Sequence, residues 1–431
     1  SVYGTVTNAI KPARNTPIHT TRPLIYFLSG YVRIVGNKFE MAKISLVFFG
    51  LLFLYPLSLA NLLHMPIEPA DAIEFEDRTT TSDPFSLHFI SGEETVIAAG
   101  TWGLNWLPDG NISYLWIDGQ LNVWLSGGPR TYLLRGPDFD HLSPHKLDDN
   151  GNAVPVFAPS GMGFDRDYAG STAVMLASNG TDLLMIYHGE DNSCGDGNTK
   201  AGIGLARSSD GGQTWTREGQ IITSPQMPAD CSFEGFKGAG NPTVLLSADG
   251  DYFYMYYMEW VSTRPDEISL ARAPRSSDGA PGTLVKFHYG DFSQPGLGGL
   301  SDAVIHRPSE TAGYAGVPNV TYNMSLGRYL AVVVGHDGFY HASSIDGTDW
   351  TTPSRFFSAP TLTAWPLLND GDSWYYYPTL ITPQQVLDDF STTSGYLYYA
   401  HGVKNRSPHY MVRRAFQLQY NPIFIPLVKE N

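Results

Sequence analysis

One hairpin pattern recurs five times along most of the sequence. Each copy has a short apolar strand, a turn containing Gly, Asp or Asn, and a second strand rich in aromatic residues. This pattern is typical of a β-hairpin, and a repeated unit constrains a fold more strongly than any single motif. The copies lie at 109–125, 167–190, 240–259, 316–336 and 377–401.

The spacing of the copies predicts a propeller. They begin about 60 to 75 residues apart, which leaves room for two further strands in each unit. Four-stranded units arranged radially form a β-propeller. The sequence therefore predicts an all-β fold, a five-bladed β-propeller over residues 97–431. The alternative is a β-sandwich with accidental similarity between hairpins, although a sandwich rarely needs about 330 residues in one domain.

The N-terminal region has the features of an export signal. Met41-Ala42-Lys43 provides a charged start, residues 44–54 are apolar, and Ser58-Leu59-Ala60 fits a small-x-small cleavage site. The alternative is a signal anchor, although the apolar run is short for a membrane span, which needs about 20 residues. We expect a secreted, extracellular protein with no stable membrane insertion after cleavage. The expected division is an upstream segment over 1–40, a signal peptide over 41–60 and an N-terminal extension over 61–96.

Two further features agree with export. Cys194 and Cys231 are the only cysteines, and a lone pair in an exported chain predicts one disulfide bond, with two unpaired thiols as the alternative. Asn-x-Ser/Thr sequons predict N-glycosylation of a secreted protein, although such sequons also arise by chance. They begin at Asn111, Asn179, Asn319, Asn323 and Asn405.

The chain is acidic, with 27 Lys and Arg residues against 42 Asp and Glu residues and a net charge of −15. An acidic surface repels a phosphate backbone, which argues against nucleic acid as a partner. The same charge keeps an extracellular protein soluble. We expect a monomer.

Propeller geometry turns the repeat into a site prediction. The first strand of each blade starts at the face where the second strand ends, so polar residues at these two positions converge at the channel mouth. In four of the five copies the aromatic strand ends in a His or a carboxylate, which we interpret as a shared functional rim rather than a coincidence of polar loops. The first-strand positions are Asp109, Asp165, Asp167, Glu234, Lys237, Asn241, Asn319 and Tyr377, and the second-strand ends are His188, Glu190, Asp191, Glu259, His336, Asp337 and His401.

Carboxylates at an aromatic-lined mouth suit glycoside cleavage, in which one protonated carboxyl group acts as the acid and another acts as base or nucleophile. The candidate catalytic residues are Asp109, Asp165, Asp167, Glu190, Glu234 and Glu259. The candidate substrate-binding residues are His188, Asn241, Asn319, His336, Asp337, Tyr377 and His401. Sugar rings would stack on Trp102, Trp106, Trp260, Trp365 or Trp374, although most aromatic residues of this kind belong to a core.

Two segments share an Asp-Gly turn followed by Trp. Ser208–Trp215 has the form Ser-x-Asp-x-Gly-x-Thr-Trp, and Ser344–Trp350 is a version shortened by one residue. The first resembles the Asp-box of sialidases and related propellers, a hairpin turn between outer strands of a blade. There the Asp side chain accepts backbone N–H bonds and the Trp packs into the blade. This resemblance implies a fold and no reaction, and we recognise no sialidase-type arginine triad.

Residues 97–431 resemble the five-bladed propeller glycosidases, the grouping that includes glycoside hydrolase families 32, 43, 62 and 68. The resemblance rests on the blade repeat and on acidic residues in the first three copies. It implies an Asp base or nucleophile at Asp109, a second Asp at Asp165 or Asp167, and a Glu acid at Glu234. Family 43 places its Glu inside the strand, whereas Glu234 precedes Gly240-Asn241-Pro242, so Glu190 and Glu259 stay open as the acid.

The expected function is that of a secreted glycoside hydrolase acting on a polysaccharide or oligosaccharide. The alternative is a non-catalytic, lectin-like propeller, and a group of paired carboxylates at the mouth would favour catalysis. We expect no cofactor, although the resemblance allows a calcium ion in the channel near His336 or His401. The sequence has no His-x-x-His motif or carboxylate loop with the spacing of a dedicated metal site.

Overall fold

The computed structural model describes residues 83–195, 197–260, 267–307, 314–324, 326–381 and 393–420. All of the described residues belong to a single compact unit. The predicted upstream segment and signal peptide lie outside the described residues. Among the residues that the structure describes, no helix is both long enough and apolar enough to cross a membrane.

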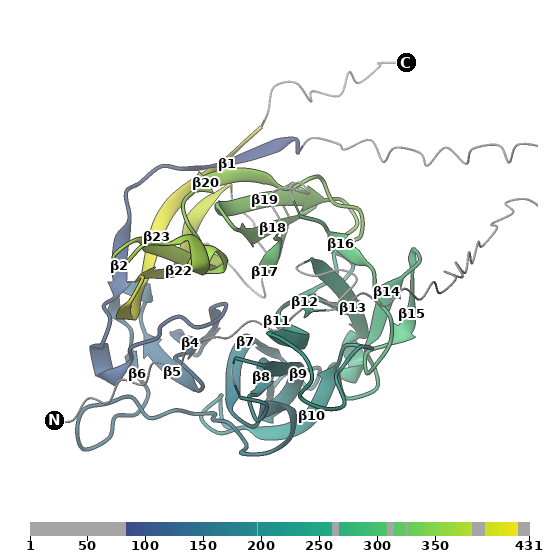
Figure 1. The fold of residues 1–431 in the computed structure, drawn as a ribbon, viewed down its shortest axis with the longest axis horizontal. Coiled ribbons are helices and arrows are strands. Elements are labelled where there is room, and N and C mark those ends of the chain that lie inside the picture. The colour runs from purple at the N-terminus through teal and green to yellow at the C-terminus, as the bar shows by residue number, and fades with distance from the viewer. Residues whose placement is uncertain are drawn as a thin grey trace, which may run out of the picture. The chain divides into compact units, whose positions relative to one another are not determined.

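Five groups of antiparallel strands circle a common axis (Figure 1). Within each group, neighbouring strands pair in chain order, so each group forms one blade that starts with its inner strand. Blades 2 and 3 belong to one continuous sheet because β9 and β11 pair in parallel over three residues. The protein is a five-bladed β-propeller, which confirms the fold predicted from the sequence.

The bounds of the strands follow the predicted hairpins closely. Blade 1 contains β3 (Ser113–Ile117), β4 (Gln120–Ser126), β5 (Thr131–Gly136) and β6 (Ser143–Pro144). Blade 2 contains β7 (Tyr168–Leu176), β8 (Leu183–Asp191), β9 (Thr199–Ser208) and β10 (Thr216–Ile222). Blade 3 contains β11 (Phe236–Leu246), β12 (Tyr252–Trp260), β13 (Ile268–Pro274) and β14 (Val285–His288), with β15 (Asp291–Pro295) and β16 (Ala303–Ile305) attached.

The remaining blades are built in the same way. Blade 4 contains β17 (Gly316–Asn323), β18 (Arg328–Gly335), β19 (Gly338–Ser344) and β20 (Ser354–Ser358). Blade 5 contains β21 (Ser373–Ile381), β22 (Ser394–Val403) and β23 (Arg406–Tyr420), together with β1 (Phe85–Phe89) and β2 (Glu94–Ile97). Short 3-10 turns lie at η2 (Thr101–Gly103), η3 (Phe139–His141), η4 (Gly163–Asp165), η5 (Arg275–Ser277) and η6 (Leu362–Leu367).

The N-terminal strands close the ring by completing blade 5. β1 pairs antiparallel with the end of β23, from Phe85 opposite Tyr420 to Phe89 opposite Phe416. The predicted boundary at residue 97 is therefore too late, because part of the predicted extension over 61–96 forms propeller strands. A hairpin pattern reveals strands that pair with a neighbour in sequence, and it does not reveal a strand whose partner lies at the other end of the chain.

The two Asp turns link the third and fourth strands of their blades. Asp210 Oδ1 accepts the backbone N–H groups of Gln213 and Thr214, each at 3.0 Å, in the turn between β9 and β10. Asp346 Oδ1 accepts the N–H groups of Thr348 and Asp349 in the equivalent turn between β19 and β20. In both turns the carboxylate satisfies backbone donors that the turn would leave without partners.

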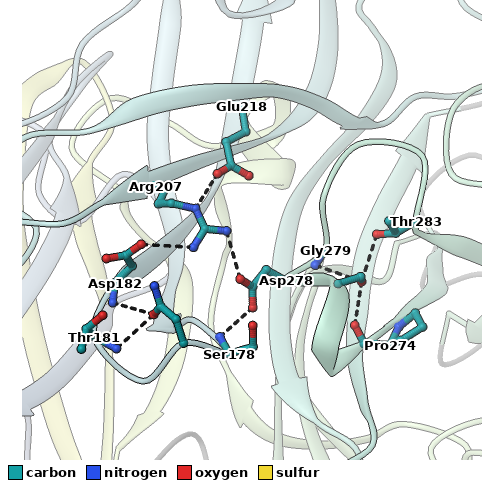
Figure 2. A network of polar contacts seen from close by, with 11 residues as sticks. Ser178, Thr181, Asp182, Arg207, Glu218, Pro274, Asp278, Gly279 and Thr283 are labelled. Atoms are coloured by element: carbon teal, nitrogen blue, oxygen red, sulfur yellow. Dashed lines mark hydrogen bonds and ion pairs between the residues drawn. The ribbon is translucent and has the colours of Figure 1, made fainter.

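Contacts between neighbouring blades stabilise the ring. An apolar cluster around Trp124 and Tyr187 joins blades 1 and 2. A polar network joins the outer parts of blades 2 and 3, where Arg207 is surrounded by Asp182, Glu218 and Asp278 (Figure 2). Asp278 also accepts the backbone N–H of Ser178 at 2.7 Å, so this carboxylate holds both a side chain and the main chain of blade 2.

The disulfide predicted from the sequence is confirmed. Cys194 and Cys231 are bonded, with their Cα atoms 5.2 Å apart. The bond connects the loop after β8 with the loop before β11, and both loops lead to the ends of strands that carry candidate site residues. The cross-link therefore restrains this part of the molecule.

A bulge recurs within the inner strands of blades 3, 4 and 5. Pairing shifts register between Gly240 and Thr243 in β11, and in the same way in β17 and β21. Asn241, Val317 and Tyr377 have positive φ values of 46°, 46° and 53°, and a proline follows each of them. Non-glycine residues rarely adopt this conformation, and such strained positions concentrate at functional sites.

The residues next to these bulges tie the inner strands together around the axis. Asn111 Nδ2, just before β3, donates to the Pro318 carbonyl at 2.7 Å. Thr379 Oγ1 accepts the Ile112 N–H at 3.1 Å, and Asn319 Oδ1 accepts the Leu380 N–H at 2.9 Å. Blades 1, 4 and 5 are thus fixed to each other beside the place where Asp109 lies.

Candidate active site at the propeller mouth

Asp109 is contacted by three blades. It lies just before β3, and its N–H donates to the Ser126 carbonyl at the end of β4. Tyr168 at the start of β7 donates its hydroxyl to the Asp109 carbonyl at 2.5 Å. Tyr377 in β21 donates its hydroxyl to Asp109 Oδ1 at 3.1 Å. The carboxyl group is therefore held where blades 1, 2 and 5 begin.

The environment of Asp109 favours the protonated carboxyl group. Burial raises its pKa from 3.8 to about 7, although the hydrogen bond from Tyr377 acts in the opposite direction. The negative charge of Glu190 raises the pKa further, which places the two carboxyl groups within electrostatic reach of each other. A carboxyl group that titrates near neutral pH is suited to proton transfer.

Glu190 is held at the end of β8 by His188. His188 Nε2 lies 3.0 Å from Glu190 Oε1, and the Asn192 amide lies 3.4 Å from Glu190 Oε2. Residues 188 and 190 lie on the same face of the strand because side chains alternate. Tyr168 is paired directly opposite Glu190 on β7, which brings the two carboxyl groups and both tyrosines to one place.

The position of His188 depends on a glycine in blade 3. A Cβ atom on Gly240 would lie 2.3 Å from His188 Nδ1, far inside contact distance. The imidazole is further enclosed by Tyr168 and Trp260, with ring centroids 5.6 Å and 6.2 Å away. The residue is 5% exposed, so its place is set by packing. It therefore presents one nitrogen to Glu190 in a fixed direction.

The mouth cluster is defined as Asp109, Tyr168, His188, Glu190 and Tyr377. Burial raises the pKa of both tyrosine hydroxyls well above the ordinary value of 10.0, so both remain hydrogen-bond donors at physiological pH. The cluster combines two carboxyl groups, an imidazole and two phenol rings. Trp260 and Phe236, whose ring centroids are 5.2 Å apart, extend the aromatic surface beside His188.

Four residues predicted for the site from the sequence meet in this cluster, namely Asp109, His188, Glu190 and Tyr377. Tyr168 was not predicted. It follows the predicted Asp167 and is the first residue of the inner strand β7, so including aromatic hydroxyls among the strand-entry positions would have found it. Their catalytic and binding roles remain predictions.

Two predicted carboxylates lie in buried ion pairs instead. Asp165 is 4% exposed, and its Oδ2 accepts Arg217 Nε at 2.6 Å and the Tyr187 hydroxyl at 3.2 Å. Glu259 is 2% exposed, and its Oε1 lies 3.0 Å from the fully buried ammonium of Lys286. Both carboxylates are enclosed, and each is paired with a cation.

Two other predicted carboxylates are exposed. Asp167 lies just before β7, where its Oδ2 accepts the Asn192 N–H at 2.7 Å. Asn192 also contacts Glu190, so Asp167 is linked to the mouth cluster through Asn192. Glu234 lies in the loop between Cys231 and β11. In the part of the chain that the structure describes, Glu234 makes no hydrogen bond or ion pair with the mouth cluster.

The remaining predicted binding residues have their own local partners. His336 Nδ1 lies 2.8 Å from Thr363 Oγ1, and Asp337 is paired with Arg355. His401 Nδ1 lies 2.7 Å from Glu93 Oε1 in blade 5. Asn241 Nδ2 lies 3.6 Å from Met258 Sδ, and the Asn319 amide oxygen accepts the Leu380 N–H. The predicted rim is therefore concentrated in blades 1, 2 and 5.

Over the described ranges, no group of three or more His, Cys, Asp or Glu side chains is arranged to hold a metal ion. His336 and His401, the histidines considered for a calcium site, contact a threonine hydroxyl and a glutamate respectively. We therefore build no step on a metal.

Comparison with known proteins gives likenesses in structure only. Neither a known protein family nor a curated protein matches the sequence. The catalytic domain of a GH62 α-L-arabinofuranosidase from Coprinopsis cinerea is 11% identical with a TM-score of 0.47, and the match covers 78% of this chain and 97% of that one. Zg3597, a family 117 glycoside hydrolase from Zobellia galactanivorans, is 10% identical with a TM-score of 0.47, covering 78% and 90%.

A GH43 endo-arabinanase from Bacillus licheniformis is 13% identical with a TM-score of 0.44, covering 72% of this chain and 96% of that one. No residue role is transferred from proteins this distant. The blade assignment rests on the strand pairing of this chain.

Proposed function

We propose that the protein is a glycoside hydrolase whose reacting groups are Asp109 and Glu190. The observation that carries the proposal is the pair itself: Asp109 lies just before the inner strand β3 and Glu190 lies at the end of β8, and the charge of Glu190 raises the pKa of Asp109. Glycoside cleavage needs one protonated and one ionised carboxyl group flanking the bond. Such pairs are found where environments push two pKa values apart.

In this mechanism Asp109 holds the proton in the resting enzyme. Its half-buried carboxyl group, with a pKa of about 7, donates to the glycosidic oxygen as the bond to the anomeric carbon breaks. Glu190, oriented by His188, is the second carboxyl group, which acts as base or nucleophile. The resemblance to propeller glycosidases implied the base or nucleophile role for Asp109, so this proposal reverses that expectation on the ground of burial.

The aromatic rings beside the carboxyl pair would bind the sugar. Tyr168 and Tyr377 keep their protons, so their hydroxyl groups can orient Asp109 while the ring faces contact substrate. Trp260 offers a further apolar face next to His188. Sugars expose C–H faces that pack on aromatic rings, and their hydroxyl groups require polar partners of this kind. We also propose that the protein is exported, on the sequence features at 41–60, and N-glycosylated at the exposed Asn179 and Asn405. The sequon residues Asn111, Asn319 and Asn323 are buried, so we expect no glycan on them.

The test is hydrolysis of neutral polysaccharides by the parent protein and by D109N, E190Q and E234Q variants. Arabinan, arabinoxylan and β-1,3-galactan are suitable first substrates, since the similar structures include proteins with such activities in their names. We expect D109N and E190Q to lower the rate of reducing-sugar release by about 100-fold or more. E234Q should retain the parent rate, because Glu234 does not contact the cluster.

Two results would overturn this proposal. Parent protein that binds these glycans on an array and releases no sugar from any of them would be a lectin. A rate that falls in E234Q and stays unchanged in E190Q would move the role of the second carboxyl group from Glu190 to Glu234. Thermal unfolding of each variant, measured in parallel, separates a lost reaction from a lost fold.

A further inference from the structure

A second pocket lies between blades 1 and 5, away from the mouth cluster. Its volume is about 220 Å³, room for several water molecules at about 30 Å³ each. It is lined by Trp116, Asp138, Phe139, Asp140, Ile381, Tyr396, Tyr398 and Arg413. Four of these eight residues are aromatic and three are charged, so the pocket offers both apolar faces and polar groups.

The pocket and the mouth cluster lie at opposite ends of the same strands. Asp109 precedes the start of β3, whereas Trp116 lies near its far end, opposite Leu121 across the hairpin turn. Ile381 and Tyr396 likewise pair at the far end of β21 and β22 from Tyr375 and His401. A ligand in this pocket would therefore not touch the reacting groups.

The aromatic walls are held in place and partly open to solvent. Trp116 is 49% exposed, unusually high for the largest apolar side chain. Behind it Phe139 packs on Tyr398 with ring centroids 4.8 Å apart, and Tyr396 carries the Arg413 guanidinium 4.6 Å above its ring. These contacts fix the rings as rigid surfaces, which lowers the entropy cost of binding a ligand.

The charges in and around the pocket select against anions. Arg413 is already paired with Glu94 Oε2 at 3.0 Å and Asp140 Oδ1 at 2.9 Å, and it donates to the Tyr398 hydroxyl. Asp138 adds a third carboxylate to the lining, and its Oδ1 accepts the Asp140 N–H and lies 2.7 Å from His141 Nδ1. Asp138 and Asp140 are 51% and 55% exposed, so their oxygens can accept hydroxyl groups from a neutral ligand.

We infer that this pocket is a second carbohydrate-binding site, which takes a neutral sugar ring between Trp116 and Tyr396 with its hydroxyl groups on Asp138 and Asp140. The inference rests on the proposed function, since a glycoside hydrolase meets neutral polymers. A chain anchored here would raise the local concentration of substrate at the mouth face without taking part in the reaction. Phosphorylated or carboxylated sugars are excluded by charge repulsion.

The experiment measures binding in the E190Q background, so that the polymer stays intact. Affinity electrophoresis in gels containing arabinan, arabinoxylan or β-1,3-galactan compares E190Q with E190Q/W116A and E190Q/D138N. We expect each substitution to weaken retardation, with about a tenfold higher dissociation constant for W116A. Y289A is the matched control, because Tyr289 is 88% exposed and lies outside the pocket.

Thermal unfolding shows whether the variants remain folded, and D138N, which preserves shape, keeps the test valid if W116A does not. Equal retardation of E190Q, W116A and D138N forms, or no retardation of E190Q in any gel, overturns the inference. Weaker binding by W116A in a protein that cleaves none of the polymers supports the second site and removes the proposed function. Cleavage by the parent together with unchanged binding in W116A supports the proposed function and overturns the second site.

Discussion

The hydroxyl group of Tyr377 donates a hydrogen bond to Asp109 Oδ1 at 3.1 Å, and this contact joins two residues that are 268 positions apart in the sequence. Asp109 precedes the first blade and Tyr377 belongs to the last, so the bond forms only when the ring is closed. β1 and β2 close that ring by pairing with β23. The state of the candidate acid is therefore coupled to closure of the propeller.

Replacing Tyr377 with Phe should raise the pKa of Asp109. The hydroxyl group favours the ionised carboxylate, so its loss favours the protonated form by about one pKa unit. If Asp109 is the acid, the alkaline limb of the kcat/KM profile should move to higher pH. The measurement is the pH–rate profile of Y377F beside Y375F, a control in the same strand. A limb that moves to lower pH would contradict the assignment.

Replacing Asp109 with Asn should stabilise the protein at alkaline pH. Burial raises the pKa of Asp109 from 3.8 to about 7. The unfolded state therefore releases this proton more easily, and the folded state loses stability as pH rises from about 4 to 7, with the full cost present above pH 7.

We expect D109N to raise the free energy of unfolding by about 2–4 kcal/mol at pH 8 and to leave it nearly unchanged at pH 4. Urea unfolding at the two pH values measures both. D149N is the control, because Asp149 is exposed. An equal effect of D109N at pH 4 and pH 8 would show that ionisation is not involved.

Much of the fold could be predicted from the sequence because each blade contains a local hairpin. The turns at Asp118-Gly119, Asn179-Gly180 and Asp249-Gly250 all lie between paired strands, as their sequences indicate. The contribution of β1 and β2 could not be predicted in this way. Their partner is β23, and no local pattern encodes a pairing between the two ends of a ring.

The candidate site was predictable to the extent that strand topology decides it. Asp109, Glu190 and Tyr377 meet because inner strands begin, and second strands end, at one face. Asp165 and Glu259 were predicted for the same site, but their positions in the strands do not reveal Arg217 and Lys286, which enclose them. Whether a carboxylate is free or paired depends on partners that the hairpin pattern does not identify.

Replacing Gly240 with Ala should displace His188 and weaken the contact between His188 and Glu190. The added Cβ atom would lie 2.3 Å from His188 Nδ1, so G240A forces either the imidazole or β11 to move. We expect a loss of stability of about 1–3 kcal/mol and a fall in kcat. In the H188A background only the contact with Trp260, whose Cζ3 would lie 2.9 Å from the added Cβ atom, remains, so G240A should cost less. This double-mutant cycle isolates the contact, and additive effects would show that the two residues do not interact.

Variants of Glu259 and Glu190 should show opposite phenotypes. Glu259 and Lys286 form a buried pair, and removing one partner of such a pair leaves an uncompensated charge at a cost of about 3–5 kcal/mol. E259Q and K286M should therefore unfold at lower temperature, with activity per folded molecule close to that of the parent. The double variant E259L/K286M should recover stability, because an apolar pair carries no charge to desolvate.

E190Q should unfold near the parent temperature and lose the reaction, because Glu190 lies at the end of a strand and reaches solvent. Differential scanning calorimetry with activity on the folded fraction measures both properties for each variant. A stable E259Q protein without activity would contradict this prediction and would support the catalytic role predicted for Glu259 from the sequence. Loss of a purely structural carboxylate should lower stability.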